Sequence, residues 1–291
     1  MRSAYNRFYL AALRVLCGHC EDFQPGLLVW TICLGCLIGT AGCTSPAAKL
    51  QAQANQIGLQ TLTLSADVFR LTAFYQPGQR PSKRLHVYLE GDGRPWLHGN
   101  WPAEDPTTQA SLMLPLLALD TGAGLYLGRP CYNGHAKDAG CDSKLWTSAR
   151  YGEQIVNAMA VALVQFCQRH DIQQLVLIGH SGGGTLALLL AGRLPQTQLI
   201  VTLAGNYDID AWTDHHGYLR LTESINPARQ AETGIEEWHF LGADDTTIPP
   251  QLILSALQHR LHSHVEVLPS VEHQTGWLEV WSGILKKINQ K

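Results

Sequence analysis

The chain has 291 residues, of which 45% are hydrophobic and 15% are charged, and its formal net charge is −3. This is the composition of a globular protein with enough apolar side chains for a sizeable core. A slightly acidic chain without a basic stripe is not expected to bind nucleic acid. Five of the eight cysteines lie within the first 43 residues, so this part of the chain needs an explanation of its own.

The N-terminal segment has the features of an export signal. Residues 27–38 are uncharged and almost wholly apolar, a length that suits a signal-peptide core and is short for a bilayer span. The small residues directly before Cys43 resemble a bacterial lipoprotein signal, in which the cysteine is lipidated and becomes the new N-terminus. Thr40 departs from that pattern, as do Glu21 and Asp22 before the apolar core, and an uncleaved N-terminal anchor is the alternative.

The N-terminal segment predicts how the chain is organised and where the protein is located. We expect a signal segment over 1–42, a small and polar tether over 43–57, and a catalytic domain over 58–291. A lipid on Cys43 would hold the protein at a membrane of the bacterial cell envelope, facing the periplasm or the exterior.

Beyond residue 57, strand-like and helix-like patterns alternate, which predicts an α/β fold with a mostly parallel sheet covered by helices on both faces. Ligands of such sheets bind at the carboxyl ends of the strands. Residues 204–234 are the least regular and are expected to form a cap or lid. The expected strands cover residues 59–64, 68–75, 85–89, 124–127, 174–178, 199–203, 237–241 and 264–268; the expected helices cover 108–119, 148–169 with Ser148 as N-cap, 185–194, 250–262 and 276–288.

The most informative stretch is Leu175-Val-Leu-Ile-Gly-His-Ser-Gly-Gly-Gly-Thr, which places Ser181 between a buried strand and a helix. A serine on such a sharp turn projects its hydroxyl clear of the backbone, and the flanking glycines leave room for close strand–helix contact. The free N–H groups of the helix N-terminus would face a negative charge that develops at the serine. A glycine-rich turn without catalysis is the alternative.

A serine hydroxyl needs a base within hydrogen-bond reach, and the base needs an orienting partner. The loop after Leu241 contains Asp244 and Asp245, and the loop after Leu268 contains His273. The chain order of serine, aspartate and histidine is that of an α/β-hydrolase triad.

From about residue 59 to its end, the chain resembles the α/β-hydrolase superfamily. Gly179-x-Ser181-x-Gly183 matches the nucleophile elbow of that family, and His273 matches its base. Gly242-x-x-Asp245-x-x-Ile248-Pro249 resembles the family's acid loop, which selects Asp245 over Asp244. Asp208 is a third candidate, because some family members place the acid one strand earlier.

The resemblance implies a serine hydrolase that cleaves an ester or a related acyl bond through an acyl-enzyme, on a small-molecule or lipid-like acyl substrate. No cofactor and no metal are expected. The family's oxyanion hole implies two backbone N–H donors, one from Gly182 and one from Asp92, with Gly91 as the alternative to Asp92. Glu90 stands where the family often has His, and a plain glycine turn is the competing interpretation. A membrane-tethered binding protein without activity, or a peptidase, are the competing functions.

The sequence contains four further features of note. Cys131 and Cys141 are expected to form a disulfide in an exported protein, stabilising the loop by roughly 2–3 kcal/mol, whereas a reducing compartment would leave two free thiols. Cys167 is expected to be a buried core thiol. The pair His215-His216 is not expected to bind a metal. Four tryptophans are candidates for lining the pocket, with core packing as the alternative: Trp96, Trp101, Trp146 and Trp212.

Overall fold

The computed structural model describes residues 44–258 and 260–290. The predicted signal segment and the lipidation site Cys43 lie outside the described residues. The predicted location in the cell envelope depends on them, and it therefore stays a prediction. Within the described part of the chain, no helix combines the length and the apolar character that crossing a bilayer requires.

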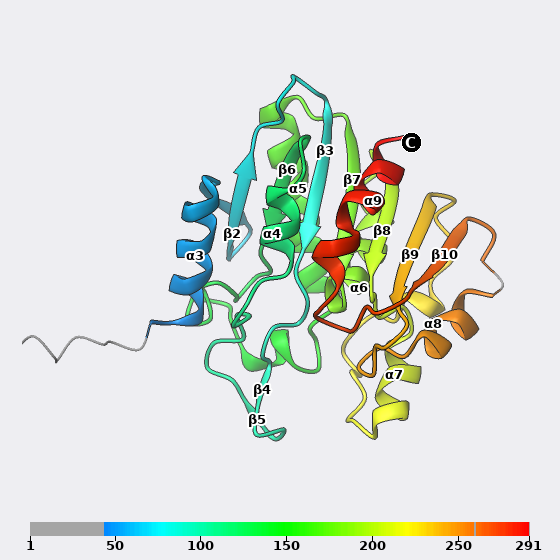
Figure 1. The fold of residues 1–291 in the computed structure, drawn as a ribbon. Helices are drawn as coiled ribbons and strands as arrows, with labels where there is room; N and C mark the ends of the chain where they lie inside the picture. The colour runs from blue at the N-terminus through cyan, green and yellow to red at the C-terminus, as the bar shows by residue number, and fades with distance from the viewer. Residues whose placement is uncertain (1–43, 259, 291) are drawn as a thin grey trace, which may run out of the picture. The chain divides into compact units, whose positions relative to one another are not determined.

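A sheet of eight strands forms the centre of the structure, in the order β1-β2-β6-β3-β7-β8-β9-β10 (Figure 1). The pairs β1–β2 and β2–β6 are antiparallel and all other neighbours are parallel, so the α/β fold with a mostly parallel sheet is confirmed. The strands are β1 Gln60–Ala66, β2 Phe69–Gln76, β3 Arg84–Leu89, β6 Ala123–Leu127, β7 Gln174–His180, β8 Thr197–Leu203, β9 Glu236–Gly242 and β10 Ser263–Leu268, and a separate short hairpin joins β4 Trp96–Leu97 to β5 Trp101–Pro102.

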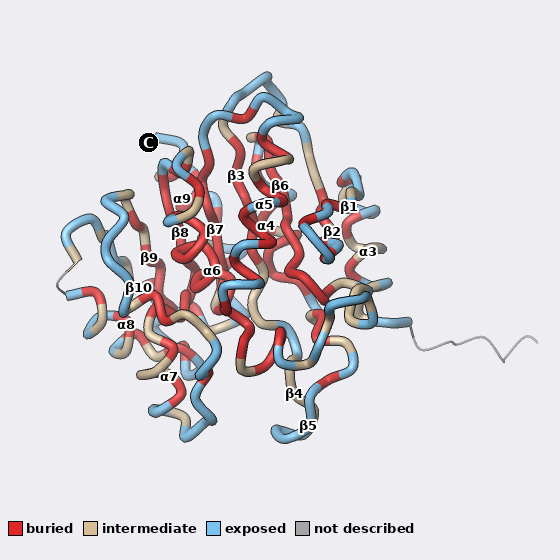
Figure 2. Tube along the Cα trace, turned by 180° about the vertical axis from the view of Figure 1, so that it is seen from behind, coloured by how far each residue is buried: buried red, intermediate tan, exposed pale blue. Residues whose placement is uncertain are grey.

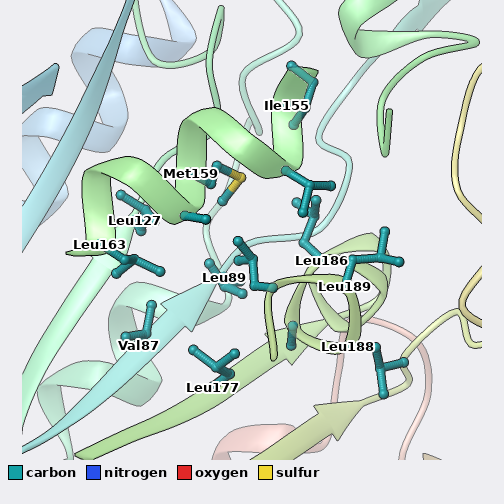
Figure 3. Packing of buried hydrophobic residues seen from close by; sticks show 14 of the residues in the cluster. Val87, Leu89, Leu127, Ile155, Met159, Leu163, Leu177, Leu186, Leu188 and Leu189 are labelled. Carbon is teal, nitrogen blue, oxygen red and sulfur yellow. The ribbon is translucent and has the colours of Figure 1, made fainter. Parts of the chain in front are cut away.

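Helices cover both faces of this sheet, which explains why its central strands are apolar on both sides. Leu177 of β7 packs with the helices α5 and α6, whereas its neighbours Val176 and Ile178 pack with α4 and α9 on the opposite face. Figure 3 shows Leu177 and two residues of β3, Val87 and Leu89, beneath α5, with Leu89 level with α6. Figure 2 shows buried chain running through the central strands. The helices are α3 Pro46–Ile57, α4 Met113–Ala118, α5 Glu153–His170, α6 Gly182–Ala191, α7 Ile209–His216, α8 Pro250–Leu257 and α9 Trp277–Asn289, with short 3₁₀ turns η1 Ser143–Trp146 and η2 Pro227–Arg229.

The predicted tether is wrong over residues 46–57, because this segment folds as helix α3. Ser45 caps the helix by accepting a hydrogen bond from the Ala48 N–H, and Leu50 and Ala54 are buried one turn apart against the rest of the domain. The compact unit accordingly begins at Ser45 rather than at residue 58. The sequence of this segment is small and polar, and only Leu50 and Ala54 are buried, so hydrophobic periodicity did not indicate a helix.

Helix α5 begins five residues later than expected, and the chain before it forms a turn. Gly152 is the N-cap, while the predicted cap Ser148 instead donates its hydroxyl to the Glu223 carboxylate. The Tyr151 N–H donates to the hydroxyl of Ser224, and the Tyr151 carbonyl accepts from the N–H of Ile225. These bonds to a distant segment hold residues 147–152 outside the helix, and sequence periodicity does not report them.

Two other helices are shorter than expected. Helix α4 begins at Met113 instead of residue 108, so that Pro115 stands in its first turn, where a missing N–H leaves no intrahelical bond unmade. Helix α8 ends at Leu257 rather than at residue 262. Within the irregular segment 204–234, the described chain contains α7 and η2.

Candidate active site

Ser181 occupies a strained turn between β7 and α6. Its φ of 53° and ψ of −122° lie in a region that residues with a side chain seldom adopt. A Cβ at Gly179 would lie 2.1 Å from the Gly183 carbonyl oxygen, and one at Gly183 would lie 2.1 Å from the carbonyl oxygen of Leu89. Both glycines are therefore required by the close approach of β3, β7 and α6 around the serine.

The structure brings Ser181, His273 and Asp245 together at the carboxyl ends of β7, β10 and β9. His273 Nε2 lies 3.0 Å from Ser181 Oγ, and His273 Nδ1 lies 2.8 Å from Asp245 Oδ2. The second carboxylate oxygen of Asp245 accepts the N–H groups of Thr247 and Ile248, each at 2.8 Å. The buried carboxylate is thus oriented by its own loop, and it directs the imidazole toward the serine hydroxyl.

The other acid candidates do not lie at this histidine. Asp244 is exposed at the surface. Asp208 is the N-cap of α7, where its carboxylate accepts the backbone N–H groups of Asp210 and Ala211. The geometry therefore selects Asp245 as the carboxylate that contacts the imidazole.

His180, which precedes the serine, holds the backbone of His273 in place. His180 Nε2 lies 2.7 Å from the His273 carbonyl oxygen, and Trp277 Nε1 donates to the same oxygen at 3.1 Å. Because a carbonyl oxygen only accepts, His180 carries its proton on Nε2. Burial, together with the nearby charge of His273, lowers the pKa of His180 to about 3 and keeps its ring neutral. This contact could not be predicted from the sequence, because the two histidines lie 93 residues apart along the chain.

This depressed pKa predicts a pH-dependent stability. The unfolded chain binds a proton near pH 6.5 and the folded chain only near pH 3, so the stabilising contribution is complete above 6.5 and is lost as the pH falls toward 3. Between pH 6 and 4.5, the wild type should lose about 1.4 kcal/mol more unfolding free energy per pH unit than His180→Gln, whose amide can still donate to the carbonyl. Urea unfolding at several pH values measures this difference, and equal slopes would contradict the prediction.

The loop after β3 lies directly against the serine. A Cβ at Gly91 would lie 3.4 Å from Ser181 Cβ. Among the described residues, no acceptor binds the N–H of Asp92 or of Gly182, whereas the Gly91 N–H has the Glu90 carboxylate 3.4 Å away. The N–H groups of Asp92 and Gly182 are thus available as hydrogen-bond donors, as the oxyanion hole predicted from the sequence requires.

Glu90, which departs from the family pattern, has a structural partner. Its carboxylate accepts the hydroxyl of Ser111 and the N–H of Met113 at the start of α4. Burial raises the pKa of Glu90, and these hydrogen bonds oppose the rise. The carboxylate therefore ties the loop after β3 to α4.

A cavity of about 800 Å³ opens onto Ser181 and His273. Trp96 and Trp212 are among its lining residues. Trp101 is 71% exposed outside the lining, and Trp146 is buried in the core, so two of the four tryptophans do not line the cavity. Tyr218 and Leu219, which follow α7, also line it, so the irregular segment 204–234 forms part of its wall.

The three cysteines of the described residues behave as the sequence predicts. Cys131 and Cys141 form a disulfide, and Cys167 is buried. Within residues 44–258 and 260–290, no three metal-ligating side chains cluster. His216 Nε2 instead lies 2.9 Å from the Thr247 carbonyl oxygen.

A mostly parallel sheet that presents a serine on a strained strand-to-helix turn is the architecture of α/β proteins with a nucleophile elbow. The family model described as the alpha/beta hydrolase fold matches residues 64–233, more than half of the chain. The chain therefore belongs to the α/β-hydrolase fold family.

Solved structures agree on the fold. The α/β serine hydrolase XC6422 from Xanthomonas campestris, described as lacking a lid, is 14% identical with a TM-score of 0.52, over 79% of this chain and 92% of its own. The esterase PF2001 from Pyrococcus furiosus is 12% identical with a TM-score of 0.59, over 81% and 91%. A bacterial membrane phospholipase A is 11% identical with a TM-score of 0.56, over 98% and 100%. At such identities the likeness concerns the fold alone. No curated protein sequence matches the chain.

Proposed function

We propose that the protein is a serine hydrolase that cleaves a carboxylic ester or a related acyl bond. The observation that carries this proposal is the continuous contact from Asp245 through His273 to Ser181, on a serine held in the strained elbow. The hydrolase fold supports the same class of activity. A binding protein would have no need for all three side chains in this hydrogen-bonded order.

The geometry supports acyl transfer in two steps. The imidazole of His273 takes the proton of Ser181 as its hydroxyl attacks the carbonyl carbon, and the Asp245 carboxylate stabilises the imidazolium. The N–H groups of Gly182 and Asp92 stabilise the oxyanion, and His273 then passes the proton to the leaving group. Water repeats the sequence on the acyl-enzyme, which regenerates the serine.

The cavity favours an acyl substrate with an apolar portion, either a small molecule or a lipid-like ester. Its wall combines the indoles of Trp96 and Trp212 with the side chains of Tyr218 and Leu219, close to the nucleophile. The phospholipase with a similar fold makes glycerolipid esters a reasonable part of a substrate panel.

A fluorophosphonate probe tests the proposal, because it labels only an activated serine. We expect the wild type to be labelled and to hydrolyse p-nitrophenyl esters, and Ser181→Ala to lose both properties. An absence of labelling in the wild type, or equal labelling of the variant, would refute it. A parallel panel of peptide amides distinguishes the peptidase alternative: faster cleavage of amides than of esters would replace esterase by peptidase.

A further inference from the structure

Beside Gly182, the residue after the serine, lies a buried cluster of charged and phenolic side chains that the catalytic steps do not use. The Asp92 carboxylate accepts from Arg129 Nη1 and from Arg150 Nη1, each at 2.8 Å. The Tyr151 hydroxyl donates to the same carboxylate at 2.6–2.7 Å. The two arginine side chains are 4–5% exposed, and that of Asp92 is 17% exposed.

These groups come from segments that are far apart in the sequence. Asp92 follows β3, Arg129 follows β6, and Arg150 and Tyr151 belong to the turn before α5. The Cys131–Cys141 disulfide begins two residues after Arg129, in the same segment after β6. Burying two guanidinium groups and a carboxylate is unfavourable relative to packing apolar side chains of similar size, so core stability alone does not explain the cluster.

The cluster anchors the backbone of the loop as well as its side chain. Arg129 Nη2 donates to the Glu90 carbonyl at 3.1 Å, and the Tyr132 hydroxyl donates to the Asp92 carbonyl at 3.2 Å. The Arg94 N–H donates to the Pro106 carbonyl at 2.8 Å. The carbonyls of Glu90 and Asp92, which flank the Asp92 N–H along the chain, are therefore both hydrogen-bonded. These bonds restrict the rotation of the peptide group between Gly91 and Asp92.

The same carboxylate also touches the second oxyanion donor. A Cβ at Gly182 would lie 2.0 Å from Asp92 Oδ1 and 2.4 Å from the Tyr151 hydroxyl. The cluster therefore packs against the first residue of α6 and fixes the distance between that residue and the loop after β3.

The charges of the cluster keep the Asp92 carboxylate ionised. Burial by itself would raise the pKa of Asp92, but Arg129 and Arg150 outweigh burial and lower that pKa below its ordinary value. The two guanidinium groups also neutralise the negative charge of the Asp92 carboxylate. Without them, this charge would repel an oxyanion that forms beside Gly182.

From this arrangement we propose that Arg129, Arg150 and Tyr151 are positioning residues, which act through the Asp92 carboxylate to hold the oxyanion loop and its N–H donor at Ser181. The inference rests on the proposed serine hydrolase activity. Because the negative charge on this oxygen develops only during the reaction and is absent from the bound substrate, a loosened loop should lower kcat and leave KM nearly unchanged.

Arg150→Met and Tyr151→Phe test the inference in the full chain, with p-nitrophenyl ester hydrolysis and thermal unfolding measured on each. We expect kcat to fall about 10- to 100-fold for Arg150→Met and about tenfold for Tyr151→Phe, with KM within about threefold of the wild type. Arg150→Lys should recover only part of the loss, because an ammonium cannot donate to both the Thr147 carbonyl and Asp92 with the geometry of the guanidinium.

Arg260→Met is the matched control. It removes the arginine of another buried ion pair, in which Arg260 Nη2 lies 2.5 Å from Glu237 Oε1, with side chains 12% and 3% exposed. It should lower the melting temperature and leave kcat unchanged. If Arg260→Met lost as much kcat as Arg150→Met, the cluster would have only a general structural role. If Arg150→Met raised KM at constant kcat, Arg150 would be a substrate-binding residue. Either result overturns the inference.

Tyr151→Phe keeps the inference testable if Arg150→Met does not fold, since it removes a single hydroxyl. Failure of the proposed function itself has a different signature, because the wild type would then show neither fluorophosphonate labelling nor ester hydrolysis.

Discussion

Replacing Asp245 by Asn is expected to lower kcat about 10⁴-fold while the protein stays folded. The Asn oxygen can still accept the N–H groups of Thr247 and Ile248, which fixes the orientation of the new amide. Its NH₂ group then faces His273 Nδ1, which must become an acceptor. The imidazole then carries its own proton on Nε2. A protonated Nε2 can no longer accept the proton of Ser181.

Asp244→Asn is the matched control for this variant. It makes the same chemical change one residue earlier, at an exposed side chain, and should retain wild-type kcat. Steady-state kinetics and the rate of fluorophosphonate labelling measure both variants, and thermal unfolding verifies their folding. A similar loss in the two variants, or full activity of Asp245→Asn, would show that Asp245 does not orient the imidazole.

Gly183→Ala is expected to abolish most of the activity and to destabilise the fold by about 3 kcal/mol or more. The added methyl group would lie 2.1 Å from the Leu89 carbonyl oxygen and 2.7 Å from that of Glu90, and both are backbone atoms that cannot rotate away. Helix α6 must then move relative to β3, which displaces Ser181 from the loop after β3. Overpacking in well-packed interiors typically costs about 1–3 kcal/mol, and a clash with backbone belongs at or above the upper end.

Gly283→Ala provides the contrast. Gly283 lies inside helix α9, and nothing comes within 4 Å of an added Cβ, so alanine should be neutral or stabilise by about 0.5–1 kcal/mol. Urea unfolding and ester hydrolysis measured on both variants test the pair. Comparable stability and activity in the two variants would contradict the assigned role of the Gly183 backbone.

The serine, the histidine and the acid loop could be predicted from the sequence because each belongs to a local pattern. A short apolar strand, a glycine-flanked serine and an apolar helix specify the elbow within about fifteen residues. Chain order and the parallel sheet then place Asp245 and His273 at the same edge as Ser181. The first residue of α5 and the helical structure of residues 46–57 could not be predicted, because both depend on contacts with segments distant in the sequence.

The sequence by itself thus determined the fold class, the elbow with Ser181, the histidine and a short set of candidate acids, because periodicity and short motifs are properties of neighbouring residues. Only the tertiary structure decided that Asp245 rather than Asp208 contacts His273, that His180 holds the His273 carbonyl, and that Asp92 is anchored by Arg129, Arg150 and Tyr151. Those contacts join strand ends and turns up to 93 residues apart. Their formation depends on how β3, β6, β7 and β10 are arranged in one sheet, and no local pattern encodes that arrangement.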